Sequence, residues 1–529
     1  MDHRKLHTKS RAALAGLLAA ATGVAATPAT SSASSVPMSH TLNLSFLQDP
    51  GQPPDPAVYY AGQGLLLQDN IYQSLVQYEA GTAERVIIPD LATGWTVSSD
   101  ARTYTFQLRK GVLFHDGTPF NSSAVWPSFK RDAAVGGGPA YMAEAVESVQ
   151  TKGPYTVVIQ LKQPNTAFLD YLASAYGPRM YSPTGLAKYA GKNDDQTYLA
   201  THDLGTGPYY LTEAKVGIAY QMKAFPDYWG KKPYYTTVNM PVIDNLDTEE
   251  VEFQSGKIDA ILHDLTAQAV KGYLKNPAYK VYSLPTLESQ FAYINPAGTF
   301  LTTSANRRAV LEAIDQRQLY DIAYKGRGSI GEQVYPRNLV PSSMSDQDIA
   351  YNPAPLKKIV ASLPASERKF TIGYDSGSSD GQLLASLITI QLDEDGLSAQ
   401  SIGYPTGTMY GWAPPGNDKG APDMVIEYVW PDAYDPYQWA DITFTPAGGI
   451  NWLHCTVPDA QAQLDQAVSN NATALFGKVG DEAFETGCYM NLMDQNDVMV
   501  AQRWLQGIPQ SHVVAAPYAL QLAGLYPAR

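Results

Sequence analysis

The stretch that decides the fold is residues 89–120, which read PDLATGWTVSSDARTYTFQLRKGVLFHDGTPF. Large apolar side chains alternate with polar ones in its second half, so that Tyr104, Phe106 and Leu108 fall on one face. A period of two residues is typical of a half-buried β-strand. The glycine and proline of the following segment, HDGTP at 115–119, favour a turn. The stretch therefore predicts a strand that ends in a tight reversal.

Length and composition indicate a globular protein with more than one domain. The chain has 529 residues, of which 44% are hydrophobic and 17% charged. This balance suits a packed core, and the length favours two or three domains. A net charge of −14 argues against nucleic acid or an anionic membrane as the main partner. The 35 tyrosines suit a polar ligand with apolar parts, although tyrosine also packs ordinary sheets.

The N-terminus is typical of an export signal. A basic start precedes a run of small apolar residues from Ala12 to Ala26, and alanine-rich cleavage options follow. We expect residues 1–35 to form a signal peptide and a flexible lead-in. A short uncleaved anchor is the alternative, since the run is short for a membrane span. No cysteine precedes Cys455, so the chain has no lipobox cysteine. The expected location is secreted or extracytoplasmic.

Cysteine is rare in this sequence, with Cys455 and Cys488 as the two examples. An exported chain favours a disulfide between them. Two buried free thiols are the alternative, because the sequence does not contain the geometry that a disulfide requires.

Four further segments follow the opening stretch along the chain: GTGPYYL at 205–211, PDYWG at 226–230, FQSGKIDA at 253–260 and NRRAVLEAIDQR at 306–317. Together the five segments resemble the extracellular solute-binding proteins of family 5. These are the oligopeptide- and dipeptide-binding receptors of ABC importers. Each segment alone is modest support, whereas five in the right order make the resemblance strong.

The resemblance implies an α/β fold that is two-lobed and periplasmic-binding-protein-like (class II, cluster C), with an additional inserted domain. Lobe I is expected to take three segments, and the inserted domain and lobe II one segment each: 40–71, 200–285 and 508–529 for lobe I, 72–199 for the inserted domain, and 286–507 for lobe II. A chain that visits lobe I three times needs a hinge with two strands, which permits closure without unfolding.

The candidate specificity element is DMVIEYVWPDAYDP at 423–436. A buried strand is predicted to end near Trp430, and a turn with acids follows. In peptide-binding relatives the acid three residues before the Asp-Pro step takes the ligand's α-ammonium, and the resemblance places Asp432 there. A carboxylate in a closed, dry cleft needs a cation. The alternative is that Asp432 or Asp435 caps the next helix or stabilises the turn.

Two positions depart from the family pattern, with Ile426 in place of an arginine and Tyr428 in place of a compact glycine. They predict a reshaped pocket with less support for a ligand carboxylate. Looser matches add further candidate ligand contacts, namely Gly62, Gln63, Tyr141, Tyr404, Tyr428, Trp430 and His263. Packing in the core is the alternative for each of them.

One pattern indicates a different class of protein. GSSDG at 377–381 fits Gly-x-Ser-x-Gly between a predicted strand (370–374) and a predicted helix (382–392), the context of a nucleophile elbow. His454 and His512 lie downstream. A secreted serine hydrolase acting through Ser379 is therefore an alternative, although geometry rather than a pattern identifies a catalytic triad.

No metal site and no cofactor are predicted. The eight histidines are scattered, without His-Glu-x-x-His or Cys-x-x-Cys, and no phosphate loop follows a strand.

Taken together, these features predict an exported, monomeric substrate-binding protein of an ABC importer rather than an enzyme. It would capture a short peptide or a related amine-bearing solute by lobe closure and deliver it unaltered to a membrane permease. The same fold serving an oligosaccharide, a metal chelate or a signalling peptide is the second hypothesis, and a fold reused for adhesion or regulation is the third.

Overall fold

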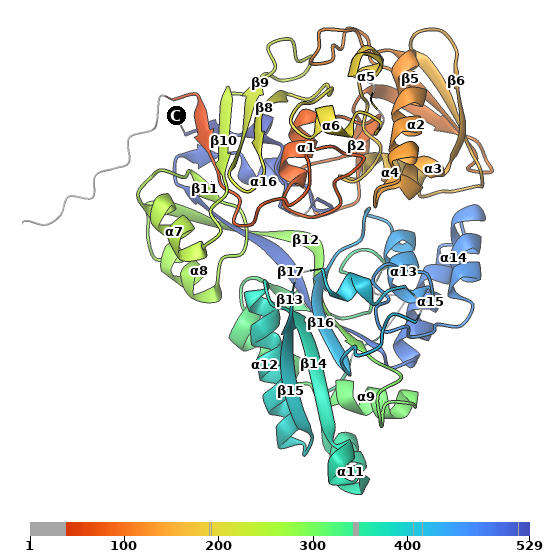
Figure 1. The fold of residues 1–529 in the computed structure, drawn as a ribbon, viewed down its shortest axis with the longest axis vertical. Coiled ribbons are helices and arrows are strands. Elements are labelled where there is room, and N and C mark those ends of the chain that lie inside the picture. The colour runs from red at the N-terminus through yellow and green to blue at the C-terminus, as the bar shows by residue number, and fades with distance from the viewer. Residues whose placement is uncertain are drawn as a thin grey trace, which may run out of the picture. The chain divides into compact units, whose positions relative to one another are not determined.

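The fold contains two long antiparallel strands, β12 (Tyr279–Ile294) and β17 (Tyr489–Gln502), drawn in green and blue in Figure 1. In this computed structural model, which describes residues 39–528 apart from 190, 192, 342–346, 348, 406, 415 and 517, they pair along almost their whole length. The register shifts between Pro285 and Ser289, where β12 bulges. A bulge of this kind bends and twists a strand.

A mixed sheet of seven strands is built on this pair, in the order β11-β17-β12-β16-β14-β15 with β13 added on β17. Strand β14 is parallel to both of its neighbours, whereas β16 is antiparallel to β12. The remaining strands of the sheet are β11 (Ala260–Ile261), β13 (Gly328–Ile330), β14 (Lys369–Asp375), β15 (Ser398–Tyr404) and β16 (Met424–Val429).

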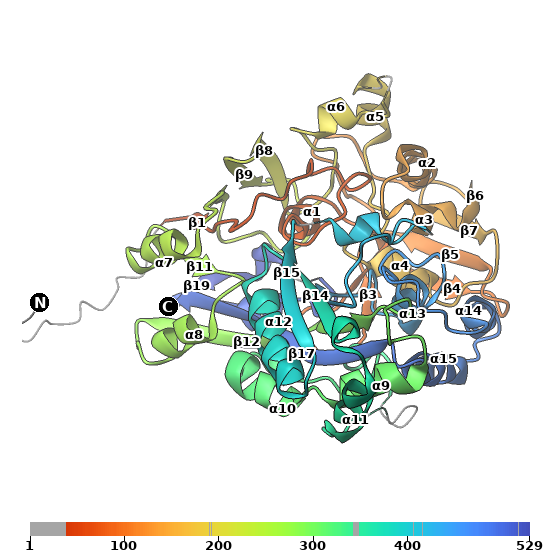
Figure 2. The ribbon, with the colours of Figure 1, turned by 60° about the horizontal axis from the view of Figure 1, so that its bottom comes forward.

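Helix α12 (Ser379–Glu394) packs on this sheet beside β14 and β15 (Figures 1 and 2). Leu384, Ile388 and Leu392 recur every four residues and are fully buried in one core with β14 and β16, which is the pattern of an amphipathic helix. The Ser378 hydroxyl accepts a hydrogen bond from the Gly381 N–H at 3.0 Å and caps the helix.

A second sheet joins segments that are far apart in the sequence. Its order is β1 (Thr41–Asn43), β10 (Thr237–Pro241), β9 (Ala219–Ala224) and β8 (Tyr209–Lys215), with β1 parallel to β10. The core beneath it also takes in Met499 from β17 and residues near the C-terminus such as Trp504 and Leu520. The N-terminal and C-terminal parts of the described chain therefore share one core.

The third sheet takes two of its strands from residues 89–120. Its order is β4 (Ala92–Val97), β5 (Thr103–Leu108), β7 (Thr156–Leu161) and β6 (Val146–Thr151). Tyr104, Phe106 and Leu108 are buried on one face of β5, as the alternation predicts. The turn after this strand is also confirmed, because the Phe114 N–H donates to the Thr118 carbonyl at 2.8 Å and Gly117 has a φ of +81°.

The other elements are short. Two further strand pairs are β2 (Val76–Tyr78) with β3 (Ile87–Pro89), and β18 (Leu505–Gln506) with β19 (Tyr526–Pro527). The helices are α1 (Leu65–Ile71), α2 (Val125–Val135), α3 (Ala140–Glu144), α4 (Phe168–Ala173), α5 (Pro183–Tyr189), α6 (Gln196–Leu199), α7 (Leu246–Gln254), α8 (Ala267–Leu274), α9 (Ser304–Glu312), α10 (Gln316–Leu319), α11 (Ala354–Ser362), α13 (Pro436–Phe444), α14 (Ala460–Ser469), α15 (Ala474–Glu485) and α16 (Ile508–Ser511). Single turns of 3₁₀ or π helix occupy Ser122–Ala124, Tyr320–Tyr324, Ala365–Glu367, Met409–Gly411 and Leu522–Gly524.

The bounds of three elements differ from those that the local sequence pattern predicts, namely a helix over 62–76, a helix over 122–132 opened by a serine cap and a first strand over 41–46. The helical spacing over 62–76 yields a helix only from Leu65 to Ile71, because Tyr72 is already extended and strand β2 starts soon after it. The helix expected to start at a serine cap is capped instead by Asn121, whose side chain accepts from the Ser123 N–H. The first strand, expected over 41–46, ends at Asn43.

The structure pairs Cys455 with Cys488, which links the loop before α14 to the start of β17. The predicted signal peptide, residues 1–35, lies outside the described residues. Within the described part of the chain, no helix has the length and apolarity needed to cross a membrane.

Candidate ligand-binding cleft

The residues around the end of β16 line a cavity of about 350 Å³, called the inner chamber here. Its wall is formed by Tyr60, Ala61, Gly62, Tyr176, Asp375, Pro405, Gly407, Met409, Tyr410, Glu427, Tyr428, Val429, Trp430, Asp432, Ile442, Ile450 and Trp452. A volume of this size falls in the range of small-molecule sites.

A second cavity of about 570 Å³, the outer chamber, adjoins the first. The two share Ala61, Gly62, Tyr428 and Trp430 as wall residues. The outer chamber adds residues of the loop before α1, of the N-terminal end of α12 and of β12, including Gln63, Ser379 and Gln290. The two chambers therefore form neighbouring parts of one cleft on either side of Trp430.

Trp430 is held by a chain of hydrogen bonds across the cleft. Its indole N–H donates to the Tyr176 hydroxyl at 3.1 Å, and that hydroxyl donates to the Ala61 carbonyl at 2.9 Å. The Tyr428 and Trp430 rings stack with their centroids 5.9 Å apart. These contacts fix the indole between the two chambers.

Asp432 is a buried carboxylate of the inner chamber that two tyrosine hydroxyls contact. Its Oδ2 accepts hydrogen bonds from the Tyr60 hydroxyl at 2.6 Å and from the Tyr141 hydroxyl at 2.8 Å. Its backbone carbonyl accepts from the Ser174 hydroxyl. The residue is only 5% exposed. Burial raises the pKa of Asp432 above the ordinary range of an aspartate, and the two tyrosine hydrogen bonds oppose that shift.

Asp435, three residues later, has a different role. Its carboxylate accepts from the Tyr437 N–H at 2.8 Å and caps α13, as the alternative interpretation predicted. The Arg85 guanidinium lies 3.7 Å from it. Burial, together with the charge of Asp170, raises the pKa of Asp435 to about 7, against the opposing charge of Arg85.

Sequence reasoning missed two carboxyl groups of the inner chamber. Glu427 is 8% exposed, and burial together with the charge of Asp375 raises its pKa well above the usual range, although backbone N–H groups of Tyr428 and Asp375 oppose the shift. One acid within the apolar strand MVIEYV was the signal that could have identified Glu427. Asp375, the last residue of β14, carried no comparable signal.

The structure brings most of the predicted site residues together. Asp432, Trp430, Tyr428 and Gly62 line the inner chamber, and Gln63 lines the outer one. A Cβ atom at Gly62 would lie 2.9 Å from the Tyr518 ring, so only glycine fits this approach without a shift of that ring.

Three predicted residues take other positions. Tyr141 reaches the site through Asp432 rather than as a wall residue. Tyr404 ends β15 and packs edge-on against Trp412, with ring centroids 5.0 Å apart. His263 is buried behind the outer chamber, where its Nδ1 lies 3.0 Å from Asp264 and its ring packs on Tyr518.

The serine pattern at 377–381 is built into a helix start. Ser378 caps α12, while Ser379 is the first helical residue and lines the outer chamber. His454 pairs with the Trp412 carbonyl at 2.9 Å, and His512 with Asp497 at 2.9 Å. No hydrogen bond joins Ser379 to a histidine in the described part of the chain, so no catalytic triad is assembled there.

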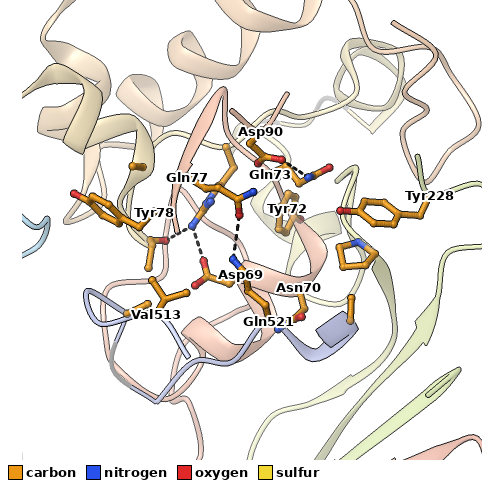
Figure 3. Close-up of a pocket in the computed structure, with 16 residues that line it drawn as sticks. Asp69, Asn70, Tyr72, Gln73, Gln77, Tyr78, Asp90, Tyr228, Val513 and Gln521 are labelled. Atoms are coloured by element: carbon orange, nitrogen blue, oxygen red, sulfur yellow. Dashed lines mark hydrogen bonds and ion pairs between the residues drawn. The ribbon is translucent and has the colours of Figure 1, made fainter. Parts of the chain in front are cut away.

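A separate polar cavity of about 120 Å³ lies among α1, β2 and the C-terminal segment (Figure 3). The Arg179 guanidinium donates to Asp69 at 2.6 Å, and the Gln521 amide donates to Gln77 at 3.1 Å (Figure 3). Burial raises the pKa of Asp90 in this wall to about 7, with the charge of Arg179 opposing it. The acid Asp69 is thus paired within the protein, unlike Asp432.

Potential metal ligands do not gather at one point in the described part of the chain. Over residues 39–528, with the gaps given above, no group of three or more His, Cys, Asp or Glu side chains is arranged to hold a metal ion.

Comparison with known proteins identifies the fold family. The sequence model for bacterial extracellular solute-binding proteins, family 5 Middle, matches residues 86–451. The chain is 24% identical over 413 residues to the nickel-binding periplasmic protein of Escherichia coli K12, covering 75% of this chain and 76% of that protein. It is 25% identical over 392 residues to the probable D,D-dipeptide-binding periplasmic protein DdpA of the same organism, covering 74% and 75%.

A solved structure extends the similarity across the fold. The periplasmic binding protein DppA of Helicobacter pylori, in complex with the peptide STSA, superposes with a TM-score of 0.77 at 22% identity and covers 92% of this chain and 98% of that one. The fold is accordingly the two-lobed, mixed α/β architecture of this family. The chain belongs to the bacterial extracellular solute-binding proteins of family 5.

Proposed function

We propose that this protein is the substrate-binding component of an ABC importer and that it captures a short peptide or a related solute with a primary amine. The ligand ammonium binds Asp432, the two lobes close over it, and the closed receptor delivers it unaltered to a membrane permease. The names of relatives such as DdpA, and the peptide bound to DppA of Helicobacter pylori, support this class of ligand.

The single observation that carries the proposal is the position of Asp432. It is buried in the wall of a cavity, and among the described residues it pairs with no Lys, Arg or His. Its two hydrogen-bond donors are neutral hydroxyls, and its Oδ1 has no hydrogen bond to the described residues. A buried carboxylate without a counter-ion is costly, and an ammonium supplies both charge and donors.

Closure follows from where the donors originate. Tyr60 precedes α1, Tyr141 belongs to α3, and Asp432 follows β16. In the domain scheme these positions belong to lobe I (40–71, 200–285 and 508–529), the inserted domain (72–199) and lobe II (286–507). A ligand that binds Asp432 therefore stabilises the state in which all three parts meet.

The hinge in this proposal is the pair of strands β12 and β17. They pass between the core that contains Met499 and the core that contains Met490, and β12 bulges between Pro285 and Ser289. Two strands with an irregular register can bend, so that the angle between the two cores changes with little loss of packing.

Members of this family are periplasmic or extracellular, and we propose the same for this chain, with residues 1–35 as its signal. We expect a monomer. Native mass spectrometry of freshly purified protein reports the oligomeric state and any ligand that stays bound, and so tests both points together with the ligand class.

The decisive experiment is calorimetric titration with norleucyl-alanine and with its N-acetylated form. We expect the free amine to bind and the acetylated peptide to bind at least tenfold more weakly, since acetylation removes the cation that Asp432 needs. Asp432→Asn should weaken binding of the free amine by about 2–5 kcal/mol. Asp395→Asn is the matched control, because Asp395 is similarly buried but lines neither chamber. Equal binding of the two peptides would refute amine recognition.

A further inference from the structure

The charged side chains that line the cleft are all acidic. Among the described residues, the walls of the two chambers contain seven carboxyl side chains and no lysine, arginine or histidine: Asp375, Glu427 and Asp432 in the inner chamber, and Asp49, Asp244, Asp264 and Asp380 in the outer one. A cleft whose walls have only negatively charged side chains favours a positively charged ligand.

The outer acids have partners within the protein. Asp380 pairs with Arg327 at 2.6 Å, and Asp264 lies 3.0 Å from His263. Asp49 accepts from the Gly217 N–H at 2.7 Å and from the Tyr220 hydroxyl at 2.9 Å. Asp380 and Asp264 therefore each have a basic partner without a ligand, whereas Asp49 has neutral donors only, and neither Asp49 nor Asp244 is fully buried.

The inner chamber differs in this respect. Neither Glu427 nor Asp432 forms an ion pair with a described residue, and the donors that reach them are tyrosine hydroxyls and backbone N–H groups. Both side chains are more than nine-tenths buried and both line the cavity. A neutral donor stabilises a buried carboxylate far less than a cation does. The inner chamber thus presents two buried acids that lack a counter-charge.

The walls between these acids are aromatic, which is a second and independent indication. Tyr60, Tyr176, Tyr410, Trp430 and Trp452 line the same cavity. Tyr410 lines the cavity with 56% of its surface exposed. Aromatic faces attract cations, and their apolar surface suits a short hydrocarbon chain.

We propose that the inner chamber binds a solute with two cationic nitrogen groups joined by a short hydrocarbon chain. One group binds Asp432 and the second binds Glu427 beside Asp375. This inference rests on the proposed function, because it takes Asp432 as the ammonium site and adds a second site. Peptides that begin with lysine carry this chemistry, and so do free diamines.

The test compares ligands that differ only in the second charge. Lysyl-alanine is titrated against norleucyl-alanine, which has the same carbon chain without the terminal nitrogen, and 1,5-diaminopentane is titrated against pentylamine. Within each pair, we expect the ligand with two cationic groups to bind about tenfold or more tightly than the ligand with one. Preference for the dipeptide or for the diamine then identifies the source of the ligand. Equal affinity within both pairs would overturn the proposal.

The variant Glu427→Gln locates the second charge. We expect the preference for lysyl-alanine over norleucyl-alanine to fall to within about threefold. Glu249→Gln is the control, since Glu249 is also buried but lines neither chamber, and it should keep the full preference. A preference that survives in Glu427→Gln contradicts the assignment.

The two proposals fail in different ways. If affinity is equal within both pairs and norleucyl-alanine still depends on its free amine, the second cation site is refuted and the amine receptor stands. If N-acetylation has no effect on either peptide, the proposed function is refuted as well. The ligand comparison on the unmodified protein decides the matter even if Glu427→Gln does not fold.

Discussion

The Tyr60 hydroxyl donates a 2.6 Å hydrogen bond to Oδ2 of Asp432, although the two residues are 372 positions apart in the sequence. The Tyr141 hydroxyl donates to the same oxygen atom at 2.8 Å. The carboxylate of Asp432, which we propose binds the ligand ammonium, is thus oriented by two segments of the chain that lie outside β16. One oxygen is occupied by these donors, which leaves Oδ1 to face a ligand.

Removing either hydroxyl should weaken ligand binding by less than removing Asp432. We expect Tyr60→Phe and Tyr141→Phe each to cost about 1.5–3 kcal/mol of binding free energy, the net value of a hydrogen bond to a charged group. Calorimetric titration of each variant and of the double variant measures this. Tyr209→Phe is the matched control, because Tyr209 also donates a buried hydrogen bond, to the Tyr235 carbonyl, but lies in the core beneath the sheet of β1, β10, β9 and β8. Unchanged affinity in the double variant would show that the hydroxyls do not support the site.

Gly62→Ala should block the passage between the two chambers. The added methyl group would lie 2.9 Å from the Tyr518 ring, so that ring must move or the cleft must stay open, whereas its 3.5 Å distance from Trp430 is an ordinary contact. We expect this variant to bind a dipeptide at least about tenfold more weakly. Its free energy of unfolding should fall by no more than about 1–3 kcal/mol, as for other overpacked sites.

Gly272→Ala is the control for this substitution. A Cβ atom there meets nothing within 4 Å, and the residue is exposed in the interior of α8. Alanine should stabilise that helix by about 1 kcal/mol and leave affinity unchanged. If Gly62→Ala binds ligand like the unmodified protein, the close approach of Gly62 to the rings has no part in recognition.

The sequence predicted the parts of the fold that depend on local pattern. Strand β5 follows from the alternation of Tyr104, Phe106 and Leu108, and α12 from apolar residues spaced four apart. The helix near residue 62 was overestimated because its apolar spacing continues past Ile71, where the backbone has already turned to extended geometry at Tyr72. Local pattern alone cannot show where tertiary contacts end a helix.

Only part of the candidate site could be predicted from the sequence, because its residues come from segments that are far apart in the chain. Asp432 was found because the resemblance aligned its strand and the following Asp-Pro step. Tyr60, Tyr176 and Tyr410 were not predicted, since each lies in a loop, a turn or a single 3₁₀ turn with no motif of its own. Glu427 offered a signal, a charge inside an apolar strand, that a search for buried unpaired acids would have caught.

The disulfide between Cys455 and Cys488 should stabilise the region around α14 and α15. It closes a loop of 33 residues, for which the chain-entropy model gives about 3–4 kcal/mol. We expect the double variant Cys455→Ala, Cys488→Ala to lose stability of this order in denaturant unfolding. Reductant should destabilise the unmodified protein to a similar extent and leave the double variant unaffected. An identical unfolding midpoint for the two proteins would contradict a stabilising role.

Stability should fall as the pH rises from about 4.5 to about 8. Burial, together with the charge of Asp497, raises the pKa of Glu288 from 4.5 to about 8, and burial raises the pKa of Asp132 to about 8 and that of Asp90 to about 7. The folded chain keeps protons on these groups after the unfolded chain has lost them, so unfolding releases protons within this range. Thermal midpoints measured at pH 5 and pH 8 should therefore be higher at pH 5.

Glu288→Gln isolates one contribution to this trend. Glu288 lies in the bulge of β12, and its Oε1 accepts from the Tyr518 hydroxyl at 2.8 Å, a bond that a glutamine oxygen can keep. The variant should be more stable than the unmodified protein by about 1–3 kcal/mol at pH 8 and nearly equal to it at pH 5, because the amide has no charge to bury. Glu485→Gln makes the same chemical change at an exposed position on α15 and should show no pH-dependent gain. A gain of the same size at both pH values would mean that Glu288 does not titrate in this range.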